Sequence, residues 1–142
     1  MISNISTRPK TMFKNALNIQ DFSFKSHTST AIIGTNGAGK STLINTILGI
    51  RSDYNFKAQN NNIPYHDNVI PQRKQLGVVS NLFNYPPGLN ANDLFKFYQF
   101  FIKLIIMDEP ETSLEQNALI RLSNLISLRN TQQLTSIIAT QI

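Results

Sequence analysis

The sequence is most constrained by a glycine-rich stretch, GTNGAGKST, at Gly34–Thr42. Gly34, Gly39, Lys40 and Ser41 satisfy the pattern G-x-x-x-x-G-K-[ST]. Glycines let backbone N–H groups curl inward around an anion without a Cβ clash, and a helix that follows directs its N-terminal N–H groups at the same anion. The stretch therefore predicts a loop that binds the phosphates of a nucleoside triphosphate.

The residues on either side of this loop have the pattern that a phosphate-binding loop requires. Thr30–Ile33 is a short apolar run, typical of a buried parallel strand that leads into the loop. The stretch Lys40–Leu48 carries apolar residues at helical spacing, and Gly49 stands where the C-terminus of that helix is expected. The alternative is a chance glycine-rich turn, which would need neither the strand nor the helix, so the context favours phosphate binding.

Three side chains of the loop have distinct expected partners. Lys40 supplies a full positive charge for the β- and γ-phosphates, and Ser41 offers a hydroxyl to Mg²⁺. Thr42 is placed to reach the α-phosphate side. A nucleoside triphosphate and Mg²⁺ are therefore the expected ligands.

A pair of carboxylates, Asp108 and Glu109, follows the apolar run Leu104–Met107. In a parallel α/β sheet, ligands bind beyond the carboxyl ends of the strands, so both side chains are expected at the edge that carries the loop. Asp108 is predicted to hold Mg²⁺ through water, and Glu109 to orient or deprotonate the attacking water. The alternative is a strand that ends in polar residues before a turn at Pro110. The phosphate-binding loop earlier in the chain favours the functional interpretation.

Strand and helix patterns alternate along the rest of the chain. Residues 1–12 are interpreted as a frayed start or an edge strand, and Leu17–Phe24 as a strand with a slip near Asp21. Residues 52–72 are interpreted as loops that hold at most a short strand. Later elements are expected as strands at 76–79, 104–107 and 134–140 and as helices at 91–101 and 118–126.

Capping residues support both of the later helices. Asn90 and Asp93 fit the start of the first helix, and Ser113 with Gln116 resembles a capping box before the second. The alternation of strands and helices predicts an α/β fold with a mainly parallel sheet and helices on both of its faces. At 142 residues, the chain is expected to form a single domain over residues 1–142.

The composition excludes several classes of protein. Without cysteine there is no disulfide framework and no Cys-ligated metal site. The net charge of +5 comes from scattered basic residues, which is typical of a solvated surface, so nucleic acid is not an expected partner. The most apolar stretch, Phe95–Met107, contains two lysines and is shorter than the roughly 20 apolar residues of a membrane span. Met1–Lys10 lacks the apolar region of a signal peptide.

Together these motifs resemble the ATP-binding cassette family, the nucleotide-binding subunits of ABC transporters. GTNGAGKST resembles the family's G-x-N-G-A-G-K-S-T, and Leu104–Glu115, LIIMDEPETSLE, resembles its Walker B strand and D-loop, usually D-E-P-T-S-G-L-D. Leu76–Leu94 resembles the Q-loop region, and Thr135–Gln141, TSIIATQ, resembles the T-x-I-I-x-T-H strand. The resemblance runs from Phe13 to the end of the chain and implies a P-loop NTPase core.

The resemblance implies roles at the matching positions. Glu109 and Gln141, the latter at the switch-histidine position, would be the catalytic residues. Ser41, Asp108 and Asn81, the last at the Q-loop glutamine position, would serve the metal. Phe13 would stack on adenine, since it precedes the loop by about the family's interval, although it fits a core position equally well. The residues implied to hold the triphosphate are Gly34, Asn36, Gly37, Ala38, Gly39, Lys40, Ser41 and Thr42.

One departure from the family pattern removes a whole segment. The family's signature sequence L-S-G-G-Q, on a helical subdomain between the Q-loop and Walker B, is absent. Only 27 positions (108 − 81) separate Asn81 from Asp108, far fewer than in the family. The helix expected at 91–101 also runs towards the next strand with no turn residues, although a reversal normally takes several residues. We interpret this as an internal deletion of the helical subdomain near Phe101–Ile102.

Smaller departures affect single positions. Asn81 is one methylene shorter than the family's glutamine, Gln141 replaces a histidine with a side chain that cannot become a cation, and Glu115 replaces an aspartate. The sequence ends at Ile142, before the C-terminal helices typical of the family.

These departures bear on activity. In the family, two subunits sandwich two ATP molecules, and each signature loop contacts the γ-phosphate bound by the other subunit. Hydrolysis needs stabilisation of charge on the transferring phosphoryl group, so we expect ATP binding with weak or absent turnover. Three functions stay open: an ABC-type ATPase coupled to transport, a degenerate nucleotide-binding module without turnover, and another P-loop ATPase such as a DNA-repair enzyme.

The resemblance also implies partners and a location. The expected partners are ATP, a membrane-spanning transporter subunit and a second cassette that forms a homo- or heterodimer through the nucleotide face. Such a chain would be cytoplasmic and peripheral to the membrane through its partner. The DNA-repair alternative would need a coiled-coil insertion or a basic surface, and neither is visible in the sequence.

Overall fold

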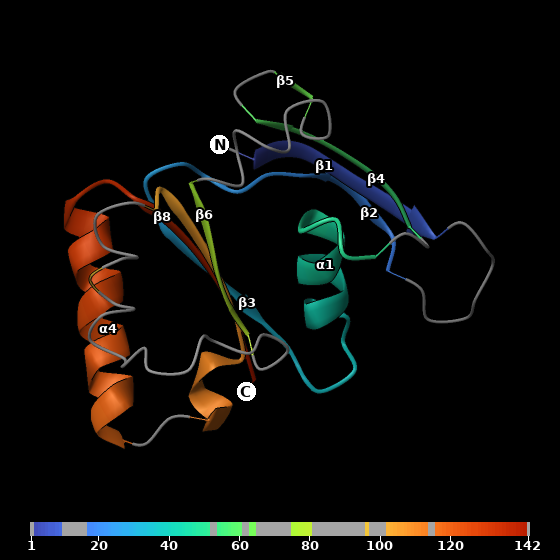
Figure 1. Ribbon diagram of the computed structural model, residues 1–142. Coiled ribbons are helices and arrows are strands. Elements are labelled where there is room, and N and C mark those ends of the chain that lie inside the picture. Colours follow the sequence, from blue (N-terminus) through green and yellow to red (C-terminus); the bar gives the residue numbers. More distant parts are fainter. Residues whose placement is uncertain are drawn as a thin grey trace.

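The computed structural model describes residues 2–9, 17–51, 54–60, 63–64, 75–80, 96, 102–113 and 116–141. Two four-stranded sheets lie on either side of helix α1, and helix α4 covers the far face of one of them (Figure 1). The elements in chain order are β1 (Ile2–Pro9), β2 (Ile19–Phe22), β3 (Ser29–Ile33), α1 (Lys40–Ile47), β4 (Tyr54–Asn60), β5 (Ile63–Pro64), β6 (Leu76–Ser80), β7 (Leu104–Asp108), the 3-10 helix η1 (Pro110–Ser113), α4 (Gln116–Thr131) and β8 (Thr135–Thr140).

The sheet that positions the candidate site is parallel, with the strand order β3-β8-β7-β6. Its registers place Asp108 of β7 opposite Ala139 of β8, and Ile33 of β3 opposite Thr140. The carboxyl ends of these three strands therefore meet at one edge, where a ligand of an α/β sheet binds. The predicted α/β fold with a mainly parallel sheet is confirmed.

Both faces of the parallel sheet are covered, as predicted. On the face towards α1, a core cluster joins Ile44 and Ile47 of the helix to Ile106 of β7 and Ile137 of β8. On the other face, α4 packs Leu122 and Leu125 against Ile105 and Met107 of β7 (Figure 1). Alternate residues of β7 thus face opposite cores, which requires a strand that is apolar on both sides. The run Leu104–Met107 supplies that pattern.

Strand β3 is less buried than the sequence suggests. The apolar run before the loop is predicted to be a buried strand, but Ile33 is 58% exposed and Ala31 is also exposed. Strand β3 lies at the margin of the described sheet and pairs there with β8 alone, so Ile32 is its side chain that packs against the core. The strand is confirmed, and the prediction that it is buried is wrong at Ala31 and Ile33.

The N-terminal segment differs from its prediction. Residues 1–12 were expected to be a frayed start or an edge strand, but β1 pairs with β2 on one side and with β4 on the other, both antiparallel. Ile2 and Ile5 of β1 are buried in the same core as α1. The region expected to be mostly loops holds β4, which is longer than the short strand foreseen. Long-range pairing and core contact, rather than local periodicity, establish these strands.

The slip predicted near Asp21 is confirmed. The register of β1 with β2 shifts between the pairs Ile5–Phe22 and Thr7–Ile19, so β2 carries one extra residue between them. Asp21 has φ of 55°, in the left-handed region that aspartate tolerates better than most residues. This combination is a β-bulge, which bends the strand locally.

The sheet edge opposite the candidate site is held by a buried arginine at the end of α4. Arg129 is fully buried and donates from Nη1 to the carbonyl of Ile102 (2.9 Å) and from Nη2 to those of Lys103 (3.3 Å) and Thr135 (3.0 Å). Its Nε donates to the hydroxyl of Ser136 at 3.2 Å. Burial lowers the pKa of Arg129 to about 10, so it stays protonated at neutral pH. The starts of β7 and β8 are thereby joined to α4.

Several predictions lie outside the described residues. They are the aromatic contact of Phe13, the metal role of Asn81, the helix at 91–101 apart from Lys96, its caps Asn90 and Asp93, the capping side chain of Ser113, Glu115 of the D-loop and the junction at Phe101. No helix in the described part of the chain is both long and apolar enough to cross a membrane.

Candidate functional site

The glycine-rich loop connects β3 to α1 and requires two of its glycines. Gly37 has φ of 78° and Gly39 has φ of 95°, both in the left-handed region that side chains disfavour. The loop also folds back closely on itself, because a Cβ added to Gly34 would lie 3.2 Å from the Cβ of Ala38. The predicted strand–loop–helix context is confirmed, and the backbone of the loop depends on glycine at positions 37 and 39.

Helix α1 begins directly at Lys40, with Gly39 as its N-cap. No side chain caps this end and no acidic residue lies in the first turn, so within the described residues its positive end is not neutralised from within the helix. At the other end, Gly49 has φ of 71°, and the N–H of Ile50 donates to the carbonyl of Asn45 at 2.9 Å. This is a Schellman motif, which confirms the predicted C-terminus at Gly49.

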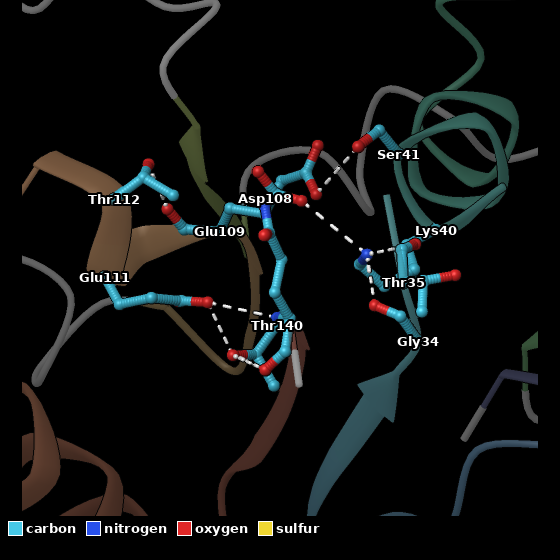
Figure 2. A network of polar contacts seen from close by, with 10 residues as sticks. Gly34, Thr35, Lys40, Ser41, Asp108, Glu109, Glu111, Thr112 and Thr140 are labelled. Atoms are coloured by element: carbon cyan, nitrogen blue, oxygen red, sulfur yellow. Dashed lines mark hydrogen bonds and ion pairs between the residues drawn. The ribbon is translucent and has the colours of Figure 1, made fainter. Parts of the chain in front are cut away.

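The side chain of Lys40 lies between the loop and the end of β7 (Figure 2). It is 6% exposed, and its Nζ donates to the carbonyls of Gly34 (2.7 Å) and Thr35 (3.1 Å). The same Nζ lies 3.7 Å from Oε1 of Glu109. The two motifs that the sequence predicts to act together are therefore in direct contact through this ammonium group.

Ser41 and Asp108 form the second link between α1 and β7. The Ser41 hydroxyl donates to Oδ1 of Asp108 at 3.1 Å (Figure 2). Asp108 is 6% exposed, and burial raises the pKa of its carboxyl above the ordinary value, although the Ser41 hydrogen bond and the charge of Lys40 act against this rise. Burial makes ionisation of this carboxyl unfavourable, and the charge of a nearby divalent cation would favour it. The Asp108 carboxyl and the Ser41 hydroxyl are therefore suited to bind such a cation together.

The chemistry of these donors fits Mg²⁺, which binds oxygen ligands and usually keeps several waters and phosphate oxygens. No cluster of three or more His, Cys, Asp or Glu side chains that could hold a metal occurs in the part of the chain that the structure describes. A cation held here would thus depend on Ser41, on Asp108 and on oxygens that a nucleotide or water brings.

Glu109 has a constrained backbone. Its φ of 46° lies in the left-handed region, where a residue other than glycine costs about 1–3 kcal/mol. Its N–H donates to the carbonyl of Ala139 at 2.9 Å, and its own carbonyl accepts from both the N–H (3.2 Å) and the hydroxyl (2.9 Å) of Thr112. Hydrogen bonds on both sides therefore hold the peptide in this conformation and direct the side chain towards Lys40.

Gln141 follows β8 and reaches the same edge of the sheet. Its backbone N–H donates to Oε1 of Glu111 at 3.3 Å, and its side chain is exposed. The hydroxyl of Thr140 donates to the same carboxylate oxygen (Figure 2). The structure thus joins the backbone of Gln141 to the segment that follows Glu109 through Glu111, a residue that sequence reasoning missed.

Glu111 could have been found only from the sheet register. It stands in the run Asp108–Ser113 as one more acidic residue in a turn, and nothing local distinguishes it. Burial acts to raise the pKa of its carboxyl, but hydrogen bonds from Thr140, from its own N–H and from Gln141 outweigh burial and lower it. The carboxylate is therefore ionised at neutral pH and serves as an acceptor.

The remaining residues predicted to hold the triphosphate lie in the loop and the first turn of α1. Asn36, Gly37 and Ala38 are exposed, and Thr42 is half-buried. The carbonyl of Thr42 accepts from the hydroxyl of Thr46 at 2.7 Å, which is a contact within the helix. The loop therefore presents its middle to solvent while Lys40 and Ser41 face the strand ends.

Comparison with protein families and curated sequences gives one match. The model of the family described as "ABC transporter" matches residues 17–136. No sequence among the curated proteins matches this chain.

Several solved structures of ABC transporter cassettes have a fold similar to that of this chain. The dimeric structure of MJ0796, a bacterial ABC transporter cassette, has a TM-score of 0.72 at 17% identity and covers 99% of this chain and 88% of its own. An ATP-binding subunit of an ABC transporter has a TM-score of 0.68 at 18% identity, and the match covers 97% of this chain and 79% of that subunit. The protein cbiO1 from Clostridium perfringens, part of the ABC transporter complex cbiONQ, has a TM-score of 0.66 at 19% identity. The match covers 100% of this chain and 80% of cbiO1. At these identities the likeness shows the fold.

Proposed function

The chain belongs to the ABC transporter family of ATP-binding domains, and from this premise we propose that its loop at Gly34–Thr42 binds Mg-ATP. The observation that carries the proposal is the position of Lys40, whose Nζ lies 2.7 Å from the Gly34 carbonyl and 3.7 Å from the Glu109 carboxylate. A single ammonium group thus faces both the loop and the acidic strand end. Phosphates placed between them would meet a buried cation in a site of reduced solvent.

Each part of the site has a proposed role towards the nucleotide. Backbone N–H groups of the loop and of the first turn of α1 hold the phosphates, together with the charge of Lys40. Ser41 and Asp108 hold Mg²⁺, with Asn81 as a further proposed ligand. When bound, the cation would neutralise charge on the phosphate oxygens. Phe13 is proposed to stack on the adenine.

Glu109 and Gln141 are proposed to act on the water that would attack the γ-phosphate. The left-handed backbone of Glu109 fixes its side chain beside Lys40 and so favours a defined orientation for that water. Because the sequence lacks an L-S-G-G-Q segment, we propose that the isolated chain binds ATP and turns it over slowly or not at all.

We further propose that the chain is one nucleotide-binding domain that works with partners. The structure of MJ0796 is described as dimeric, and cbiO1 as part of a transporter complex, which supports a second cassette and a membrane-spanning subunit as partners. A nucleotide face formed by strand ends and loop fits such a dimer. The proposed location is the cytoplasmic side of a membrane, peripheral and held by the partner.

Binding and turnover are tested separately. The dissociation constant for Mg-ATP is measured by calorimetry for the full chain, for Lys40→Ala and for Lys57→Ala, which removes an exposed lysine of β4 as a matched control. Lys40→Ala should weaken binding by at least about tenfold, because a charge-assisted hydrogen bond contributes about 1.5–3 kcal/mol. Lys57→Ala should leave it unchanged.

Two results would contradict the proposal. Equal Mg-ATP affinity in the unaltered chain and in Lys40→Ala would show that the loop does not form the binding site. A rate of phosphate release comparable to that of ordinary transporter ATPases, and lost in Lys40→Ala, would refute the proposed slow turnover.

A further inference from the structure

Two donors from the end of β8 meet at one oxygen of Glu111. The hydroxyl of Thr140 and the backbone N–H of Gln141 both donate to Oε1, the second at 3.3 Å (Figure 2). Glu111 lies in η1, directly after β7, and is half-buried. The contact therefore ties the segment after one strand to the end of its neighbour.

This tie lies where the backbone ladder between the two strands ends. Strands β7 and β8 pair in parallel up to Asp108 and Ala139, and the N–H of Glu109 donates to the Ala139 carbonyl at 2.9 Å. At Glu109 the chain turns into η1 and leaves the sheet. From there on the carboxylate of Glu111 takes the place of a strand partner and accepts the N–H of Gln141.

Glu111 is also linked to the backbone of Glu109 from within its own turn. The carbonyl of Glu109 accepts from the N–H and the hydroxyl of Thr112, the residue after Glu111. A movement of η1 would consequently shift the Glu109 peptide and the Gln141 N–H together. Lys40 completes the group, since its Nζ lies 3.7 Å from Glu109.

The geometry points to Glu111 as a positioning residue that holds Gln141 and Glu109 in register, so that the site distinguishes ATP from ADP. The inference rests on the proposed function, in which these two residues face the γ-phosphate. ATP and ADP differ by the γ-phosphate alone, and Lys40 is the loop side chain expected to reach it. Apart from the charge of Lys40, a preference for ATP must therefore arise beside Lys40, where β7 and β8 end.

The charge state of Glu111 is compatible with this role. The carboxylate of Glu111 accepts hydrogen bonds from a hydroxyl and from backbone N–H groups, which fix its orientation within the fold. These bonds also lower the pKa of the carboxyl, which keeps it an acceptor at neutral pH. Glu111 thus orients its neighbours without itself touching the nucleotide.

The test compares dissociation constants for Mg-ATP and Mg-ADP by calorimetry, so that no turnover is needed. Glu111→Ala removes the acceptor, and Glu111→Gln keeps a carbonyl oxygen that accepts from the same two donors. In Glu111→Ala the ATP-over-ADP preference should fall about five- to tenfold while the ADP constant stays within about twofold, because the contacts shared by both nucleotides lie in the loop. In Glu111→Gln the preference should be retained.

A second variant keeps the test decisive if Glu111→Ala does not fold. Thr140→Val has nearly the same shape and removes one of the two donors. It should lower the ATP-over-ADP preference by about two- to threefold with the thermal midpoint little changed.

Several outcomes separate this inference from a merely structural contact. Equal weakening of both nucleotides in Glu111→Ala, or the same loss of preference in Glu111→Gln, would overturn the positioning role. A chain that binds both nucleotides with equal affinity, or a preference lost in Gln141→Ala and kept in Glu111→Ala, would also overturn it, while the proposed function stands. Binding of neither nucleotide to the unaltered chain would instead refute the proposed function.

Discussion

Lys40 Nζ and Glu109 Oε1 lie 3.7 Å apart, with the lysine almost fully buried and the carboxylate 22% exposed. The lysine also donates to the loop carbonyls at 2.7 and 3.1 Å, so its charge is shared between the phosphate-binding loop and the end of β7. A nucleotide that bound to Lys40 would compete with Glu109 for the same ammonium group. This competition gives Glu109 an influence on affinity in addition to its proposed role towards water.

Glu109→Gln is expected to bind Mg-ATP more tightly than the unaltered chain. The substitution frees Lys40 from an ion pair and removes a negative charge beside the proposed γ-phosphate position. A partly exposed ion pair contributes about 0.2–1 kcal/mol, which corresponds to a gain of up to about fivefold in affinity. Calorimetry at low and high salt checks this, with Asp21→Asn, an exposed acid of β2, as the control. Weaker binding in Glu109→Gln would contradict the competition.

Asp108→Asn is expected to make the folded chain more stable and, at the same time, to remove the effect of Mg²⁺ on ATP affinity. Burial raises the pKa of Asp108, so ionisation is less favourable in the folded chain than in the unfolded one. For an acid with a raised pKa, stability is present below the unfolded pKa and is lost as pH rises through the folded pKa. Asn avoids this loss and can still accept the hydrogen bond of Ser41.

The thermal midpoint of Asp108→Asn without nucleotide should therefore exceed that of the unaltered chain at neutral pH. The difference in thermal midpoint should vanish near pH 3, where Asp108 is protonated in both the folded and the unfolded chain. ATP affinity in the variant should in addition lose its dependence on Mg²⁺. A lower midpoint at neutral pH, or an unchanged Mg²⁺ dependence, would show that Asp108 does not act as described.

Gly39→Ala and Gly49→Ala form a matched pair. Both glycines have positive φ, 95° and 71°, so a side chain at either position costs about 1–2 kcal/mol of stability. Gly39 lies in the loop, whereas Gly49 ends α1 on the side away from it. Both variants should have a lower thermal midpoint by a few degrees, and Gly39→Ala alone should weaken Mg-ATP binding. Equal ATP affinities in the two variants would place the phosphates elsewhere.

Local sequence was sufficient for the elements around the loop. The glycine pattern, the helical spacing after Lys40 and the apolar run before Asp108 each predict their structure from neighbouring residues. The pairing of β1 with β4 was beyond this reasoning, because Ile2 and Ile5 owe their burial to strands and a helix distant in the chain. The burial of strand β3 was overestimated for the same reason, because it depends on which strands lie beside β3 in the sheet.

The candidate site was predictable to the extent that motifs mark it. Lys40 and Asp108 are identified by the motifs in which they stand. The structure brings these two motifs together through the contacts of Ser41 with Asp108 and of Lys40 with Glu109. Glu111 and Arg129 are not identified by any sequence motif. Glu111 gains its role from the parallel register of β7 and β8, and Arg129 from the burial of a cation among carbonyls at the strand starts.

Arg129→Met is expected to be the most destabilising of the variants considered. The guanidinium is fully buried and donates to three carbonyls and the hydroxyl of Ser136. Met has a similar apolar stem, so the change leaves the packing largely intact and removes the donors. The carbonyls of Ile102, Lys103 and Thr135 would then lose a buried charged donor, and a hydrogen bond to a charged group contributes about 1.5–3 kcal/mol.

We therefore expect Arg129→Met to reduce the free energy of unfolding by about 3 kcal/mol or more, measured by urea denaturation. Arg121→Met on the same helix is the control, because Arg121 is exposed and should contribute within about 0.5 kcal/mol. Arg129 lies at the edge opposite the loop, so nucleotide affinity in the folded fraction of Arg129→Met should be unchanged. If that affinity fell while stability did not, Arg129 would act on the site rather than on the fold.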